Sequence, residues 1–511
     1  MNDTPVLFGL ETEFGIARGQ DVDLDVVAES MALVRSAAEP GVLMRWDYRE
    51  ENPHRDVRGF EVEALRQDYD EAGYLEADSK RELSFAEIKS DFVFANGARF
   101  YNDHAHPEYC TPECATTRDV VLHDRAGERI VMACAAALSR EVGDTVRLYK
   151  NNTDFAGHSY GCHENYLIPR ALEWNVLADA VLAFLVTRQT YAGAGKYGIE
   201  EENRLIGPGF QISQRSDFFS ELQSVDTMQS RPLINTRDEP HADPRRWRRF
   251  HVILGDANLS PFATSLKVGA TALVLEAIVR QPRRAWPRLA APLRAVRSIS
   301  RDPKWRWEVA LARSGGRTGP STALEIQATY LEAVRECCDL TSPDRRGCVD
   351  AWAEVLEDLA TDPMRCADRL DWVAKHRLIR RFQDAEGLSD GDPWLRSLDL
   401  EYHRLDPDEG LYFGLEQSGS MRGVPPPADV EAAIHHPPKD TRAALRGRCI
   451  ERFRSAVLSA QWDHVTLQSR NGPLRVDLTQ LFDPRTIAAW LEVVETASSP
   501  DDLRFPGSDG H

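Results

Sequence analysis

Hydrophobic and polar positions alternate along several short segments of this chain, and this alternation predicts the strands of a sheet. In NGARFYND, residues 96–103, the side chains of Arg99, Tyr101 and Asp103 are two residues apart and therefore lie on one face. Val and Ile are the usual residues on a strand face that packs into a core. The segment therefore predicts a sheet with one polar face.

Three further strand-like segments repeat this spacing of charged side chains. They are ETE with Glu11 and Glu13, CHENY with His163 and Asn165, and RDEPH with Arg237, Glu239 and His241 if that strand extends into the proline. A single polar strand is typical of the solvated face of an antiparallel sheet. Carboxylates, imidazoles and guanidiniums that recur on four strands are instead ligands for hard cations and phosphates. The four segments together predict a curved sheet that holds a metal nucleotide.

Apolar residues at helical spacing predict the remaining elements. The expected helices cover 22–38, 118–142, 171–193 and 260–280, and residues 320–400 are expected to be mostly helical. A Pro- and Gly-rich break at 419–438 precedes a small C-terminal unit, which is predicted to be a helix, a pair of strands and a helix. Residues 41–87 are dense in charge and lack a period, so they predict a long mobile loop with little to bury.

Composition excludes several classes of protein. An apolar share of 42% and a charged share of 28% over 511 residues are typical of a soluble globular chain. The formal net charge of −19 argues against general affinity for nucleic acid, which needs Lys and Arg to neutralise phosphates. Arginine clusters at 245–251, 281–298 and 377–382 are either solvated helix faces or parts of an anion-binding groove.

The chain also lacks the sequence signals of export and of several common catalytic sites. No basic region precedes the short apolar run near the N-terminus, and no stretch approaches the roughly 20 apolar residues of a membrane span, so a cytoplasmic location is predicted. The nine cysteines form no C-x-x-C pair, which argues against a zinc ribbon. The P-loop, H-E-x-x-H and G-x-S-x-G motifs are absent.

Several long motifs resemble those of one family. GLETEFG, NGARFYNDHAHPEY, SYGCHENYL, INTRDEPHAD and RRFHVILGDAN resemble the bacterial Pup-modifying enzymes, a family that comprises the Pup ligase and the Pup deamidase/depupylase. The resemblance implies an α+β fold similar to glutamine synthetase, in which helices pack on a curved, mainly antiparallel sheet. It implies a catalytic domain over 1–425, with the charged loop at about 41–87, and a small C-terminal domain over 435–505.

The resemblance also implies the reaction, the cofactors and the partners. Residues 46–60 resemble a loop of the deamidase/depupylase, and Asp-His-Ala-His at 103–106 stands where the ligase typically has Gly-Ser after the aspartate. The expected activity is an ATP- and Mg²⁺-dependent amidase and isopeptidase that deamidates the C-terminal glutamine of Pup and cleaves the Pup–lysine bond of pupylated proteins. ATP, or ADP plus phosphate, would stay bound as a cofactor. A monomer with a functional link to the bacterial proteasome is expected.

Two alternatives stay open. The first is the Pup–protein ligase, which would form the isopeptide bond with hydrolysis of ATP. The second is a nucleotide-dependent adaptor that binds Pup without turnover.

Individual roles come from the same resemblance. Asp103 is the expected catalytic carboxylate, acting as nucleophile or as general base. Arg99 and Arg237 are expected at the phosphates, Trp462 near the adenine, and His241 beside the triphosphate. The expected metal ligands are Glu11, Glu13, Tyr101, Glu108, His163 and His241.

Overall fold

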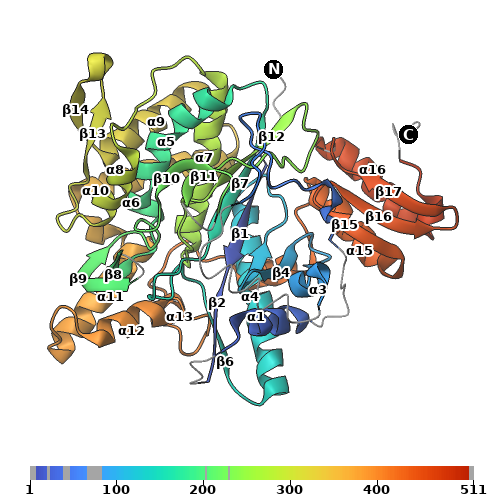
Figure 1. Ribbon diagram of the computed structural model, residues 1–511, viewed down its shortest axis with the longest axis horizontal. Helices are drawn as coiled ribbons and strands as arrows, with labels where there is room; N and C mark the ends of the chain where they lie inside the picture. The colour runs from blue at the N-terminus through green and yellow to red at the C-terminus, as the bar shows by residue number, and fades with distance from the viewer. Residues whose placement is uncertain are drawn as a thin grey trace.

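An eight-stranded sheet forms the centre of the molecule (Figure 1). The computed structural model describes residues 7–19, 24–37, 46–65, 83–201, 204–227, 231–480 and 482–505. In order across the sheet, the strands are β10 (Glu221–Ser224), β11 (Pro232–Asn235), β12 (Trp247–Val252), β7 (Cys162–Pro169), β1 (Phe8–Glu13), β5 (His106–Cys110), β4 (Arg99–Asp103) and β3 (Phe92–Val93). Neighbouring strands are antiparallel except β10 and β11, so the prediction of a mainly antiparallel sheet is confirmed.

Helices cover one face of this sheet. Apolar residues alternate with polar ones along the strands, and the apolar side chains point to that face. Phe8, Tyr166 and Phe250 pack against α5 (Trp174–Thr187) and α7 (Pro261–Arg280) in one core. Phe100 and Tyr109 lie in a second core with the apolar side of α4 (Thr117–Val142). The helices predicted over 118–142 and 260–280 are therefore confirmed. The segment 171–193 is helical as α5 and the short α6 (Gln189–Ala192).

Helix α7 has the length and the apolar composition of a membrane span. It is the one helix of the described residues that is long and apolar enough to cross a membrane, with a mean hydropathy of 1.6 in its most apolar window. The sequence-based expectation that no segment approaches this length is therefore wrong for α7. However, 78% of that window is buried inside the structure, which is typical of a core helix.

The remaining elements surround the sheet. The other helices of the main body are α1 (Val26–Arg35), α3 (Phe85–Lys89), α8 (Pro292–Ser300), α9 (Ala323–Cys337), α10 (Pro343–Thr361), α11 (Asp371–Glu386), α12 (Pro393–Tyr402), α13 (Leu411–Gln417) and α14 (Pro427–His435). Three strand pairs complete it: β2 (Gly15–Arg18) with β6 (Val146–Tyr149), β8 (Lys196–Glu201) with β9 (Arg204–Gln211), and β13 (Glu308–Ala312) with β14 (Thr318–Thr322). The mostly helical character predicted for 320–400 is confirmed.

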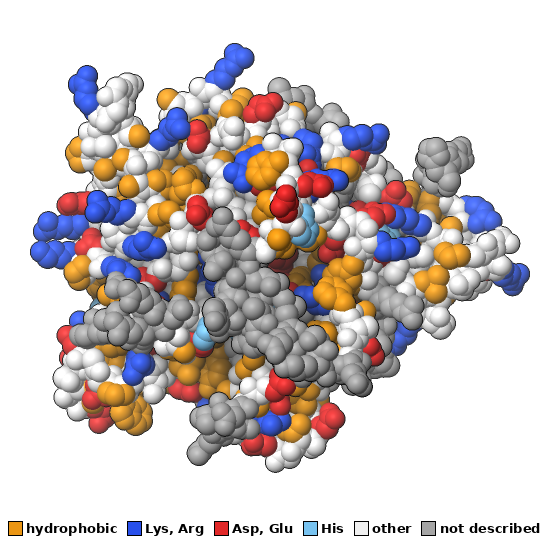
Figure 2. Space-filling view, viewed as in Figure 1, with side chains coloured by type: hydrophobic (Ala, Val, Ile, Leu, Met, Phe, Trp, Pro, Cys, Tyr) orange, Lys and Arg blue, Asp and Glu red, His pale blue; other side chains and the backbone are white. Residues whose placement is uncertain are grey.

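The C-terminal unit projects from the right side of the molecule in Figure 1, and its small core also includes Trp46 and Val93 of the main body. It consists of α15 (Arg442–Phe453), β15 (Val457–Gln461), β16 (His464–Ser469), β17 (Gly472–Asp477) and α16 (Pro484–Thr496). The prediction of a strand pair was wrong, because these strands form a three-stranded sheet. Figure 2 shows acidic and basic side chains interspersed over this unit and the body, so the negative net charge is not gathered on this face.

The described part of the charged loop is more buried than its composition predicts. Residues 41–45 and 66–82 lie outside the described residues. Trp46 is 5% exposed and packs edge-on against Trp462, with ring centroids 5.3 Å apart. Asp56 is 1% exposed and accepts a hydrogen bond from Thr236 at 2.6 Å. The expectation of little to bury is therefore wrong for this stretch, which joins the main sheet to the C-terminal unit.

A buried ion-pair cluster fastens the C-terminal unit to the sheet, and it predicts a dependence of stability on pH. Arg442 Nε and Arg446 Nη2 donate to the Glu113 carboxylate at 2.6 and 2.5 Å. Burial raises the pKa of Glu113, but the two guanidiniums outweigh it and hold that pKa at about 2. A carboxyl with a depressed folded pKa stabilises the protein above its unfolded pKa of 4.5 and loses this contribution as pH falls toward about 2.

We therefore expect Glu113→Gln to lower the free energy of unfolding at pH 7 by about 3 kcal/mol, because two buried arginines lose their counter-charge. Urea denaturation at pH 7 and pH 3 measures this effect. The difference between variant and wild type should shrink at pH 3, and an equal difference at both pH values would contradict the assignment.

Candidate active site

The concave face of the sheet gathers the polar positions that the sequence pattern singled out. Glu11 lies opposite Cys110 on β5 and His163 on β7, and Glu13 lies opposite Glu108. On β4, Tyr101 pairs with Glu108 and Asp103 with His106. Cross-strand partners share a face, so the period-two spacing brings these side chains together. The predicted polar face is confirmed for these strands.

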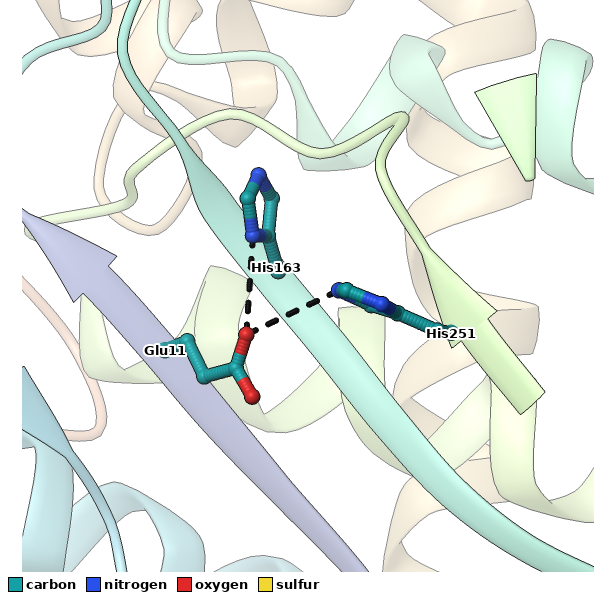
Figure 3. Close-up of side chains that lie close together, drawn as sticks. All are labelled: Glu11, His163 and His251. Atoms are coloured by element: carbon teal, nitrogen blue, oxygen red, sulfur yellow. Dashed lines mark ion pairs between the residues drawn. The ribbon is translucent and has the colours of Figure 1, made fainter. Parts of the chain in front are cut away.

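One group of possible metal ligands comes from three adjacent strands (Figure 3). Glu11 Oε2 lies 3.5 Å from Nδ1 of His163 and 3.6 Å from Nε2 of His251. Burial raises the pKa of Glu11, but the hydrogen bond with His163 and the positive charge of Arg249 outweigh burial and hold that pKa below its usual value. Burial and the charge of Arg249 hold the pKa of His251 well below its usual value, so its ring is neutral, as a metal ligand must be.

A second group shares His163 with the first and adds Glu13 and Glu108. Glu108 is 2% exposed, and its Oε1 accepts a hydrogen bond from the Tyr101 hydroxyl at 2.7 Å. Burial and the negative charges of Asp103, Glu11 and Glu13 raise the pKa of Glu108 well above its usual value. Carboxylates crowded in this way without a counter-ion repel one another, which is the arrangement that a bound cation relieves.

The donor set fits a divalent cation. The two groups supply three carboxylates and two imidazoles whose ligand atoms lie within 4.8 Å of one another in each group. Both ring nitrogens of the buried His251 lack a hydrogen-bond partner among the described residues. Burying an unpaired polar group costs free energy, so these nitrogens are suited to a ligand. Tyr101 contacts this group as a hydrogen-bond donor to Glu108.

Asp103 ends β4 at the tight hairpin to β5. Its Oδ1 accepts a hydrogen bond from Lys89 Nζ at 2.6 Å, and its Oδ2 lies 3.2 Å from Nδ1 of His104. Burial raises the pKa of Asp103, but the charges of Lys89 and His104 outweigh it and hold that pKa well below its usual value. The carboxylate is therefore ionised, as a nucleophile or a general base requires.

An apolar pocket of about 90 Å³ opens at the other end of the concave face. Trp462 of the C-terminal unit, His241 and Arg249 line it, and Glu11 lies where the pocket meets the acidic groups. His241, which the resemblance includes among the metal ligands, belongs to neither acidic group in the described part of the chain. The prediction that RDEPH continues as a strand was wrong, because β11 ends at Asn235 and His241 adopts a φ of 49°.

Both arginines that are expected at the phosphates contact other residues of the protein. Arg99 is 7% exposed, and its guanidinium lies between the rings of Trp46 and Tyr101, 4.0 and 3.8 Å from their centroids. Its Nε also donates to Asp91 at 2.9 Å. Arg237 Nε donates to the carbonyl of Val225 at 2.9 Å.

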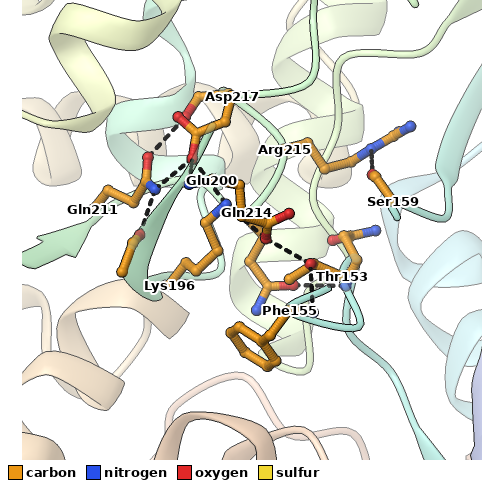
Figure 4. A network of polar contacts seen from close by, with 12 residues as sticks. Thr153, Phe155, Ser159, Lys196, Glu200, Gln211, Gln214, Arg215 and Asp217 are labelled. Atoms are coloured by element: carbon orange, nitrogen blue, oxygen red, sulfur yellow. Dashed lines mark hydrogen bonds and ion pairs between the residues drawn. The ribbon is translucent and has the colours of Figure 1, made fainter. Parts of the chain in front are cut away.

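A buried polar network links β8 to the segment that precedes β7 (Figure 4). Lys196 Nζ lies 3.2 Å from Glu200 Oε1 and 3.0 Å from Asp217 Oδ2. Glu200 Oε1 also accepts a hydrogen bond at 2.6 Å from Thr153, in the segment that leads to Tyr160. The ring of Tyr160 stacks on His106, with centroids 4.5 Å apart. The network therefore fixes the segment before β7, which places Tyr160 beside His106.

Sequence reasoning missed His251 and Arg249. Both lie on β12, where His251 pairs with Asn165 of β7 and Arg249 Nη1 donates to the Asn165 side chain at 3.2 Å. The segment RRWRRFH stood out as an arginine cluster and as the start of a family motif, but neither gave a role to these two residues. Its alternation at 249 and 251 was a usable signal, since it matches the spacing in ETE and CHENY.

The fold and this concave site together define an α+β protein of the glutamine synthetase-like class. Residues 6–466 match the model of one family, described as Pup-ligase protein. This match covers most of the chain, which therefore belongs to that family.

Individual relatives refine this assignment. The chain is 42% identical over 471 residues to the Pup deamidase/depupylase of Mycobacterium tuberculosis, with 90% of each chain covered. It is 41% identical over 393 residues to a Pup–protein ligase of Nocardioides sp., and this match covers 75% of this chain and 85% of the ligase. The solved structure of the Pup ligase PafA in complex with ADP has a TM-score of 0.71 at 32% identity, and the match covers 88% of this chain and 99% of PafA.

Proposed function

We propose that this protein is an ATP- and Mg²⁺-dependent hydrolase that deamidates the C-terminal glutamine of Pup and cleaves the Pup–lysine bond of pupylated proteins. The observation that carries the proposal is the order of groups along the concave face. The apolar pocket with Trp462 is followed by Glu11 and the imidazoles, then by Glu13 and Glu108, and last by Asp103. This order suits a nucleotide with its base in the pocket and its phosphates toward the reacting carboxylate.

The residues that line the pocket and a relative of similar fold support the proposed position of the nucleotide. Trp462 offers an aromatic face, and Arg249 lines the same pocket at 3.7 Å from Glu11. Arg forks match phosphate oxygens, and an aromatic ring stacks on a base. A solved relative of similar fold is a complex with ADP. We assign His241 and Arg237 to the surroundings of the phosphates.

We assign Mg²⁺ to the carboxylates of Glu11, Glu13 and Glu108, with His163 and His251 beside them. Hard divalent cations prefer carboxylate oxygens and share their coordination shell with phosphates. When bound, such a cation supplies positive charge that stabilises developing negative charge on oxygen. Glu11 and Glu108 hold its position because Asn165 and Tyr101 fix their oxygens by hydrogen bonds of 2.9 and 2.7 Å.

Asp103 is the group that we assign to the chemical step. Both proposed reactions attack the carbonyl of a γ-carboxamide, so one carboxylate can serve both. As a nucleophile it forms an anhydride, and as a base it removes a proton from water. Lys89 keeps it ionised and oriented in either role.

The relatives favour the hydrolase over the ligase. The deamidase/depupylase match covers 90% of this chain, whereas the ligase match covers 75%. One experiment separates the two activities. With ATP and Pup that ends in glutamine, the hydrolase releases ammonia without stoichiometric ADP. A requirement for terminal glutamate and one ADP per bond formed would establish the ligase instead, and Pup binding without turnover would establish the adaptor.

The proposal gives Trp462 a measurable role. We expect Trp462→Ala to weaken ATP binding about 10-fold, because stacking on a base contributes roughly 1–3 kcal/mol. Isothermal titration with ATP measures the affinity. Trp462→Phe keeps an aromatic face and serves as the matched control, so similar losses in both variants would contradict stacking.

Three further assignments belong to this proposal. We propose a division of the chain into a catalytic domain over 1–425 and a C-terminal domain over 435–505. We also propose a cytoplasmic monomer. A link to the bacterial proteasome follows from the proposed substrate.

A further inference from the structure

His104 lies on the proposed catalytic carboxylate in an uncommon backbone conformation. Its Nδ1 is 3.2 Å from Asp103 Oδ2, and its side chain is 32% exposed. Its φ of 54° is rare for a residue other than glycine, and the turn between Asp103 and His106 holds it there. The imidazole therefore contacts the carboxylate and is also partly open to solvent.

We propose that His104 donates the proton that the leaving amine needs when the γ-carboxamide is cleaved. This inference rests on the proposed function. An amide nitrogen leaves only as a neutral amine, because an amide anion is too basic to be expelled. The carbonyl carbon must approach Asp103 to about 3–3.5 Å before attack. A nitrogen bonded to that carbon then lies within reach of a ring that contacts the same carboxylate.

The charge change in the first step favours this transfer. Attack by an Asp103 oxygen forms a C–O bond, and the carbonyl electron pair moves to oxygen. The pair on oxygen then re-forms the carbonyl as the C–N bond breaks, and the electron pair of that bond stays on nitrogen, which takes a proton from the His104 imidazolium. Asp103 loses its negative charge as the anhydride forms, so the imidazolium loses its counter-charge and releases the proton more easily. Water then opens the anhydride to two carboxylates, and of the two protons released one restores the His104 imidazolium and the other is taken up by the free amine.

The same logic holds if Asp103 activates water instead. The carboxylate then becomes neutral by taking the proton of water, and His104 again loses its counter-charge. The net reaction is the same: one water is consumed, and the products are one carboxylate and one protonated amine.

The other cations near Asp103 are less suited to this role. Lys89 donates to Asp103 Oδ1 at 2.6 Å and lies over the Tyr101 ring at 5.3 Å, but an ammonium with a reference pKa of about 10.4 is a weak acid at neutral pH. His106 is engaged elsewhere: its ring stacks on Tyr160, and its Nδ1 lies 3.8 Å from Glu13, whereas Nδ1 of His104 lies at Asp103. An imidazole is the side chain whose usual pKa suits proton transfer near pH 7.

Two substrates with different leaving groups test the proposal. One is Pup that ends in glutamine, which must expel ammonia. The other is Pup whose terminal glutamate carries a γ-ester of 7-hydroxycoumarin, which leaves as a phenolate without a proton. We expect His104→Gln to lower ammonia release about 100-fold and to change coumarin release less than about 3-fold. Imidazole in solution should restore part of the ammonia release of His104→Ala.

An equal loss on both substrates, or no loss on either, would overturn the role of His104. Circular dichroism of the variants shows whether they are folded, and a folded variant with equal losses points to a structural role. His435→Gln removes an exposed imidazole from α14 and should match the wild type on both substrates. Failure of the wild-type protein to release ammonia would refute the proposed function itself, which keeps the two results distinct.

Discussion

Replacing Asp103 with Asn is expected to abolish release of ammonia from Pup that ends in glutamine, by about 1000-fold or more. The amide keeps the shape of the side chain, but it can neither form an anhydride nor accept a proton from water. Lys89, at 2.6 Å from Oδ1, also loses its counter-charge. An assay of ammonia at saturating ATP and Pup measures the effect.

ATP affinity separates this loss of chemistry from a loss of binding. Asp103 lies at the hairpin end of the concave face, away from the pocket that Trp462 lines, so the variant should bind ATP with nearly wild-type affinity. Asp408→Asn removes an exposed carboxylate and should leave the rate unchanged. Ammonia release above a tenth of the wild-type rate in Asp103→Asn would rule out the assigned role.

Replacing Glu11 with Gln is expected to remove the response of the protein to Mg²⁺. Glu11 contacts both imidazoles of its group, so loss of its charge removes the central ligand while the side-chain shape is kept. The rate should fall about 100-fold or more, because a metal ligand is lost outright. Thermal unfolding measured against Mg²⁺ concentration in the presence of ATP provides a readout that does not depend on activity.

A ligand at 100 times its dissociation constant stabilises a folded protein by about 2.7 kcal/mol. The wild type should therefore gain several degrees on addition of Mg²⁺, and Glu11→Gln should gain little. Glu386→Gln, on the exposed side of α11, is the matched control and should behave as the wild type. An unchanged Mg²⁺ response in Glu11→Gln would exclude this residue as a ligand.

Local sequence patterns predicted which residues share the polar face of the sheet, but not which strands are neighbours. The alternation of Arg99, Tyr101 and Asp103 is a property of one strand and can be read from the chain. The contact of Glu11 with His251 depends on β12 lying next to β7, which lies next to β1. This order joins strands that are far apart in the sequence, so no local spacing encodes it.

The buried part of the charged loop was missed for another reason. Asp47 and Asp56 each pair with the arginine two residues later, at 2.5 and 2.7 Å, and each also accepts the backbone N–H of that arginine. A carboxylate satisfied in this way can be buried, although the composition of the stretch is that of a solvated loop. Composition counts charges and does not reveal which of them are paired.

The contacts between the first and last parts of the chain fix the order in which the molecule can be completed. Gln461 Nε2 lies 3.3 Å from Glu51 Oε1, a separation of 410 positions, and the His464 ring contacts Asp47 across 417. Synthesis proceeds from the N-terminus, so the early segment leaves the ribosome long before its partners exist. Trp462 also arrives at this late stage. The nascent chain therefore cannot assemble the complete pocket until the segment around Trp462 has left the ribosome.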